Sequence, residues 1–107
     1  MRVLIDESLP QRIAEELPEH EVSTVRQQRW TGLRNGVLLR SAVAAGSQVF
    51  ITADRKLQYQ QNIPAIGIAV VVLIGVRNKI ENLRPLLPKV LDALSSIQRG
   101  TVVEIAG

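Results

Sequence analysis

The chain has 107 residues, 46% of them hydrophobic, and a formal net charge of +3, which fits one folded domain over 1–107 and excludes a disordered chain. It contains no cysteine and a single histidine, so disulfides, thiolate metal sites and histidine-rich zinc sites are excluded, and a bound metal must be an oxygen-liganded ion such as Mg²⁺ or Mn²⁺. All but three of the thirteen basic residues are arginine, which suits phosphate, although a modest positive charge is also common in other proteins.

Apolar runs and capping residues divide the chain into alternating strands and helices. The expected helix starts are Ser8, Asn35 and either Asn78 or Asn82, and Pro85 is expected to kink or delay the last helix. In chain order the predicted elements are a strand over 3–5, a helix over 9–17, a strand over 21–25, a helix over 35–45, a strand over 49–52, a short turn over 56–61, a strand over 66–74, a helix ending at Gly100 and a strand over 101–105.

This order of elements predicts a three-layer α/β/α sandwich around a mostly parallel five-stranded sheet. The nearly unbroken β-branched run over 66–74 is typical of a strand that is covered on both faces. We expect the strand order 2-1-3-4-5, in which the first and third strands are neighbours and the strand order reverses between them. The apolar stripe of the last helix is interpreted as core or as the face of a homodimer.

Acidic residues follow two of the predicted buried strands. Asp6 and Glu7 come directly after the first strand, and Asp54 comes just after the third. Because the carboxyl ends of parallel strands lie at one edge of a sheet, we expect Asp6 and Asp54 to face one crevice. Neighbouring carboxylates repel one another, and a divalent cation relieves that repulsion. The pattern therefore predicts an Mg²⁺ or Mn²⁺ site of Asp6, Glu7 and Asp54, although Asp is also common in turns and Glu7 suits a helix start.

Three segments resemble a group of short bacterial PIN-like proteins related to VapC-type toxin nucleases. They are LIDESLP at 4–10, WTGLRNGVLLRSA at 30–42 and VFITADRKLQYQQN at 49–62, and the part from Ile51 to Asn62 is the most specific. The resemblance covers nearly the whole chain and implies an α/β/α sandwich with a parallel sheet. It also implies endonuclease cleavage of single-stranded RNA, or DNA, by acidic residues that hold Mg²⁺ or Mn²⁺.

The resemblance implies roles for individual residues. Asp6, Glu7 and Asp54 would be the catalytic and metal-binding acids, and Thr52 would be the hydroxyl companion of Asp54. Arg55 could meet substrate phosphate. Apart from the resemblance, the charge of the basic loop over 26–34 suggests a phosphate-binding lip, although its arginines also fit a simply solvated loop. The candidate substrate-binding residues are Thr52, Arg55, Arg34, Asn35 and Gln61.

One position departs from the family pattern. Relatives commonly carry an acid just after the Asn35-Gly36 pair, whereas this chain has Val37 there and no acid between Glu21 and Asp54. A catalytically degenerate PIN-like binding module is therefore an alternative to the ribonuclease. A phospho-receiver domain is a weaker one, because the chain lacks the Ser/Thr and Lys that receivers carry after their fourth and fifth strands.

The sequence predicts neither a signal peptide nor a membrane span. The N-terminal segment is charged by residue 6, and the longest apolar run, over 63–76, is too short to cross a bilayer. We therefore expect a cytoplasmic protein with no membrane partner. The resemblance implies single-stranded RNA, or DNA, as a partner, and a toxin–antitoxin pair in which a small antitoxin protein is the second partner.

Overall fold

Five parallel strands form the central sheet of the protein. The structure is a computed structural model that describes residues 1–74 and 79–106. The sheet order is β2-β1-β3-β4-β5, as the sequence predicts, and every pair of neighbouring strands is parallel. The strands are β1 (Arg2–Ile5), β2 (Glu21–Thr24), β3 (Val49–Thr52), β4 (Ala69–Ile74) and β5 (Val102–Ala106).

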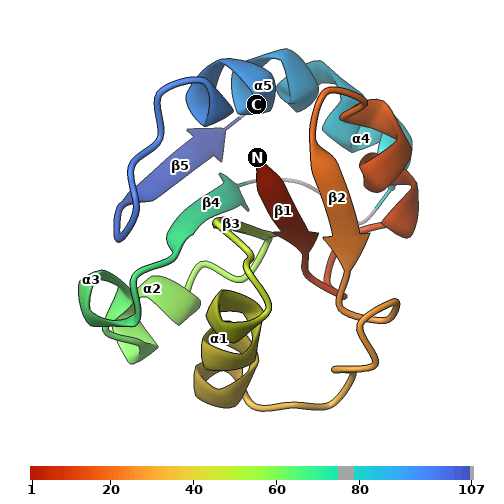
Figure 1. Cartoon of the computed structure of the whole chain (residues 1–107). Helices are drawn as coiled ribbons and strands as arrows, with labels where there is room; N and C mark the ends of the chain where they lie inside the picture. The colour runs from red at the N-terminus through yellow and green to blue at the C-terminus, as the bar shows by residue number, and fades with distance from the viewer. Residues whose placement is uncertain (75–78, 107) are drawn as a thin grey trace.

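Helices cover both faces of the sheet, which confirms the predicted sandwich (Figure 1). Successive residues of a strand point to opposite faces, so Val3 and Ile5 join one core cluster while Leu4 joins the other. The first cluster lies under the helices drawn at the top of Figure 1, namely η1 (Gln11–Glu16), α4 (Ile80–Leu83), η2 (Arg84–Leu86) and α5 (Leu87–Leu94). The second lies under those at the bottom, namely α1 (Asn35–Ala44), α2 (Leu57–Gln60) and α3 (Ile63–Ile66).

Two predicted elements begin later than the sequence suggests. The predicted α-helix over 9–17 is instead the short 3-10 helix η1, with Pro10 rather than Ser8 at its N-cap. The predicted strand over 66–74 begins only at Ala69, because Asn62 caps the preceding helix α3 through a hydrogen bond from the backbone N–H of Ala65. Gly67 ends α3 at φ +84°, a conformation that glycine adopts without strain.

The last helical region also differs in its ends. It begins at Ile80 rather than at Asn82, whereas Asn78 lies outside the described residues. A 3-10 segment, η2, interrupts it at Pro85, which has no backbone N–H for an α-helical hydrogen bond. Of the two predicted effects of Pro85, a kink or a delayed start, the helical region therefore shows a local disruption and not a delayed start. Its last helix, α5, ends at Leu94, well before Gly100. Within the described residues, no helix has the length and apolar character needed to span a membrane.

The register of the sheet aligns the ends of β1 and β3. Ile5 lies opposite Ile51, so Asp6 follows β1 at the level of Thr52, the last residue of β3. The backbone N–H of Asp6 donates to the carbonyl oxygen of Ile51 over 2.9 Å, which extends the ladder one step beyond β1. The segment after β1 is therefore fixed against the end of β3.

Candidate functional site

The carboxylate of Asp6 accepts hydrogen bonds from two hydroxyl groups. Thr52, which is completely buried, donates to Oδ2 over 2.6 Å, and Ser8 donates to the same oxygen over 2.8 Å. Hydrogen bonds to an ionised carboxylate are shorter and stronger than neutral ones. Both lone pairs of Oδ2 are thus engaged, whereas Oδ1 accepts no hydrogen bond from the described residues and is the oxygen left for a ligand.

The same two hydroxyls hold the backbone that follows β3. The Thr52 hydroxyl accepts from the N–H of Asp54 over 3.0 Å, and the Ser8 hydroxyl accepts from the N–H of Ala53 over 3.3 Å. Each hydroxyl therefore bridges the Asp6 carboxylate and the turn that carries Asp54. The structure brings Asp6 and the backbone of Asp54 to one edge of the sheet through a single hydroxyl group.

Asp54 uses one carboxylate oxygen within its own turn. Its Oδ1 accepts from the backbone N–H of Lys56 over 3.0 Å, the pattern of an Asx turn. This bond shapes the turn that precedes α2. It shows that Asp54 has the turn-forming role that the sequence suggests as the alternative to metal binding. Asp54 is half-buried, and its Oδ2 accepts no hydrogen bond from the described residues, so this oxygen is free to bind a ligand.

Glu7 shares a hollow with Asp6. It is exposed, and it lines with Asp6 a hollow of about 220 Å³ near the carboxyl ends of β1 and β2. Asp54 is not part of this hollow. The hollow is also lined by Leu9, Pro10, Gln11, Thr24 and Arg26.

Three of the four other candidate substrate-binding residues lie around the start of α1, and the fourth, Arg55, follows Asp54. Gln61 lies beside the first turn of α1, because a Cβ atom placed on Gly36 would be only 3.1 Å from the Oε1 atom of Gln61. Asn35 is the first residue of this helix, and the exposed Arg34 occupies the N-cap, where the sequence predicts Asn35. Arg55 is exposed and directly follows Asp54.

The carboxylates of the candidate site suit a cation that is held by one or two protein ligands rather than by three. Among residues 1–74 and 79–106, no three side chains of His, Cys, Asp or Glu are placed to hold one metal ion. The described residues therefore do not provide the three-carboxylate centre of Asp6, Glu7 and Asp54. However, Mg²⁺ commonly takes one or two protein carboxylates and completes its shell with water and substrate phosphates. The free oxygens of Asp6 and Asp54 fit that second kind of binding.

Sequence reasoning missed the role of Ser8. It assigns Ser8 as a helix cap, whereas its hydroxyl instead donates to Asp6 and accepts from Ala53. The signal that could have found it is the spacing, since a serine two residues after an aspartate can donate back to its carboxylate.

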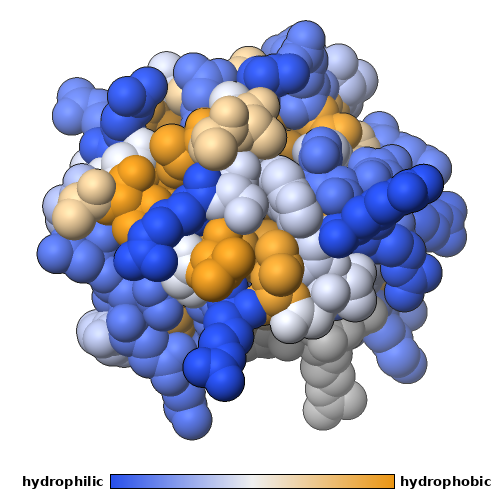
Figure 2. All heavy atoms as spheres, turned by 60° about the horizontal axis from the view of Figure 1, so that its bottom comes forward, coloured by the Kyte–Doolittle hydropathy of each residue, from blue (hydrophilic) through white to orange (hydrophobic). Residues whose placement is uncertain are grey.

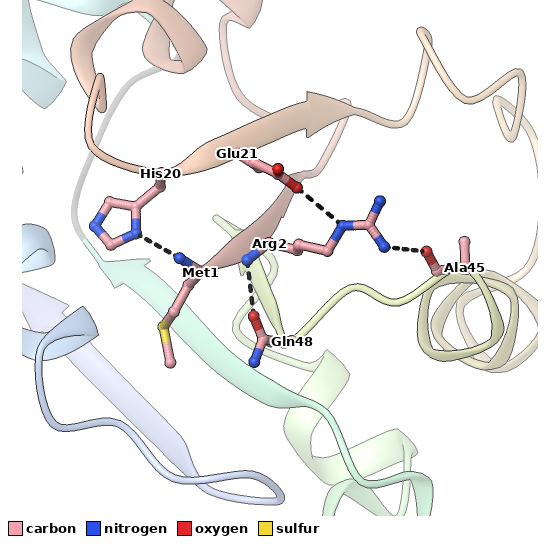
Figure 3. A network of polar contacts seen from close by, with 6 residues as sticks. All are labelled: Met1, Arg2, His20, Glu21, Ala45 and Gln48. Carbon is pink, nitrogen blue, oxygen red and sulfur yellow. Dashed lines mark hydrogen bonds and ion pairs between the residues drawn. The ribbon is translucent and has the colours of Figure 1, made fainter.

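A second hollow among the described residues lies away from these acids. It measures about 350 Å³ and is lined mainly by the first residues of β1 and β2 and by the segment that follows α1. Its charged groups are already paired, because Arg2 donates to Glu21 over 3.0 Å and to the carbonyl oxygen of Ala45 over 3.1 Å (Figure 3). Gln48 and His20 extend this network around the start of β1. We therefore assign it a structural role.

Neither models of known protein families, nor curated proteins, nor solved structures match this chain. What the protein does must therefore be inferred from the chemistry of its own residues.

Proposed function

We propose that the protein is an Mg²⁺- or Mn²⁺-dependent endoribonuclease of the PIN-like type that acts on single-stranded RNA. The observation that carries this proposal is the bridge from Asp6 through the Thr52 hydroxyl to Asp54. It joins the carboxylate of Asp6 to the backbone N–H of Asp54, from distant parts of the sequence, at the carboxyl edge of a parallel sheet, where such folds bind ligands. The resemblance of 4–10, 30–42 and 49–62 to PIN-like proteins gives the reaction class.

Asp6 and Asp54 would hold the cation through Oδ1 and Oδ2, respectively. When bound, the cation supplies Lewis-acid polarisation of the phosphodiester and activation of a water molecule. Thr52 and Ser8 orient the Asp6 carboxylate, because both hydroxyls donate to its other oxygen. Arg55, exposed beside Asp54, is available for the substrate phosphate. A cytoplasmic toxin paired with a small antitoxin protein is the biological setting that we propose.

A cleavage assay tests this proposal. Asp6→Asn and Asp54→Asn keep an oxygen acceptor of nearly the same shape, so the hydrogen bonds from Thr52 and Lys56 can persist while the negative charge is lost. Asp92→Asn, an exposed acid in α5, is the matched control. We expect Mn²⁺-dependent cleavage of single-stranded RNA to fall at least a hundredfold in the first two variants and to persist in the control. Undiminished cleavage in both site variants would refute the assignment.

A catalytically degenerate PIN-like binding module is the second candidate. The observation that favours it is Val37, which is 49% exposed in the first turn of α1 at the position where PIN-like relatives commonly carry an acid. A calorimetric titration with Mn²⁺ separates the two candidates. Heat of binding that is lost in Asp6→Asn supports the enzyme, whereas no heat together with no cleavage supports the binding module.

A further inference from the structure

Four exposed arginines lie in a part of the chain that contains no acid. They are Arg26, Arg29, Arg34 and Arg40, and no Asp or Glu occurs between Glu21 and Asp54. Within the described residues the ion pairs are Arg2–Glu21 and Arg84–Glu16, so none of these four arginines is neutralised by an ion pair there. The first turn of α1 also contains no acidic residue. This part of the surface is therefore strongly positive.

The arginines lie at the same edge of the sheet as the candidate site. Three of them belong to the segment that leaves the carboxyl end of β2 and enters α1 at Asn35. Arg40 lies one turn further on, and its guanidinium is directed back toward the start of α1, since a Cβ atom on Gly36 would be 3.7 Å from its Nη1 atom. Arg26 lines the hollow that also contains Asp6 and Glu7. One of the four arginines thus reaches the hollow at Asp6.

Apolar side chains are exposed among these arginines. Leu33 is 38% exposed and Val37 is 49% exposed. Figure 2 turns the bottom of Figure 1, where α1 lies, toward the viewer, and shows separate apolar patches between strongly hydrophilic side chains. Leu33 and Val37 are aliphatic and do not form the aromatic stacking platform of many single-strand binders, so the arginines, which suit phosphate, carry the argument for a polyanion.

Backbone hydrogen bonds tie the loop to the end of β1, and one of its residues has a positive φ. Trp30 and Val25 anchor it, because the N–H of Trp30 donates to Val25 and the N–H of Val25 donates to Ile5. Arg29 adopts φ +62°, a left-handed conformation that costs less for glycine or asparagine. Arginine thus occupies a position that the backbone alone would give to glycine, which favours a functional role for its side chain.

We propose that Arg26, Arg29, Arg34 and Arg40 form a phosphate-binding track along which single-stranded RNA reaches Asp6 from the β2 side. The choice of RNA as the ligand rests on the proposed function. The location of the track rests on four positive charges that are unpaired within the described residues, on Arg26 in the hollow at Asp6 and on the backbone hydrogen bonds that tie the loop to the end of β1. The sequence already indicates the loop over 26–34 as a possible phosphate-binding lip, and the track adds Arg40 and a direction of approach to Asp6.

The salt dependence of RNA binding tests the track. Fluorescence anisotropy with a labelled oligouridine, in EDTA so that no metal-dependent cleavage occurs, gives the affinity at several salt concentrations. For single strands, the plot of log affinity against log salt concentration has a negative slope. Its magnitude decreases by about 0.7 for each phosphate that the protein no longer neutralises. We expect each single Arg→Gln variant of the track to reduce the slope by about this amount, and the quadruple variant by about 3.

Two arginines elsewhere on the surface provide matched controls. Arg12→Gln in η1 and Arg99→Gln before β5 remove the same charge from exposed positions outside the track, and we expect no change in slope. Unchanged slopes in the four single variants, or equal changes in the controls, would overturn the track. Tighter binding of an oligoglutamate peptide than of the RNA, lost in the same variants, would overturn it in favour of an acidic protein partner.

The RNA-binding test of the track and the cleavage test of the proposed nuclease can succeed or fail independently. Arginine-dependent RNA binding without Mn²⁺-dependent cleavage supports the track and contradicts the enzyme. Cleavage that the four variants leave unchanged supports the enzyme and contradicts the track. The single variants keep the test decisive if the quadruple variant does not fold, as circular dichroism would show.

Discussion

The hydroxyl of Thr52 donates a 2.6 Å hydrogen bond to Oδ2 of Asp6, which joins the end of β3 to the residue that follows β1. These residues are 46 positions apart in the sequence. Because Thr52 is completely buried and also accepts from the N–H of Asp54, its hydroxyl fixes the geometry of the carboxyl edge on both sides. The bond is therefore the central contact of the candidate site.

Thr52→Val tests how much this hydrogen bond contributes to the free energy of unfolding. Valine has nearly the shape of threonine but no hydroxyl, so Asp6 loses a donor and the N–H of Asp54 loses its acceptor. We expect the free energy of unfolding to fall by about 1–3 kcal/mol, measured by urea denaturation. Thr31→Val makes the same change at an exposed residue and should stay within about 0.5 kcal/mol of the wild type. A Thr52 variant as stable as the Thr31 variant would contradict the role of the bond.

Ser8→Ala tests the second hydroxyl. The variant removes the other donor to Asp6 and leaves the N–H of Ala53 without its acceptor. We expect a loss of about 1 kcal/mol of unfolding free energy, which is smaller than that of Thr52→Val because Ser8 is only half-buried. Ser96→Ala, at an exposed serine near the end of α5, serves as the control in the same urea titration. Equal effects of the two serine substitutions would show that Ser8 does not support the site.

Val37→Glu tests whether the missing helix-borne acid limits cation binding. The side chain at this position is 49% exposed, and a glutamate in the first turn of α1 interacts favourably with the helix dipole, so the fold should tolerate it. We expect the affinity for Mn²⁺, measured by calorimetry, to rise about tenfold, which corresponds to about 1.4 kcal/mol.

Val43→Glu is the matched control for this substitution. Val43 is 37% exposed on the same helix but lies in its last turn, where a negative charge interacts unfavourably with the dipole. It should leave the Mn²⁺ affinity unchanged. The same rise in both variants would mean that added negative charge, rather than a ligand at position 37, increases the affinity.

Arg29→Gly should separate stability from binding. Glycine adopts the left-handed conformation of this position without steric cost, so we expect the free energy of unfolding to rise by about 1 kcal/mol. Because the variant also removes one arginine of the track, RNA binding should weaken in the anisotropy assay. Arg26→Gly, at a neighbouring arginine without a positive φ, should weaken binding with no gain in stability. A less stable Arg29→Gly protein would contradict the strain at this position.

The sequence predicted the topology well because the relevant signals are local. Strand β3 has the bounds 49–52 that its apolar run predicts, and β2 lies within the predicted strand over 21–25. The start of β4 was wrong for a physical reason. The apolar run from Ile66 suggested a continuous strand, whereas the Asn62 cap and the positive φ of Gly67 end a helical turn there first.

The candidate site was predictable only in part. The topology places Asp6 and Asp54 at one edge, and a strand order read from the sequence is enough to expect this. Which oxygen of each carboxylate stays free depends on donors such as Thr52 and Lys56, whose orientation follows from packing rather than from spacing. The hollow that Glu7 lines with Asp6, without Asp54, was likewise not readable from the sequence.

A crystal soaked in Mn²⁺ tests the central claim most directly. An anomalous difference map reports the position of the ion without depending on catalysis. The account predicts a peak within coordination distance of the carboxylates of both Asp6 and Asp54, absent from an Asp6→Asn crystal soaked in the same way. No peak at this edge, or a peak held by neither carboxylate, would contradict it.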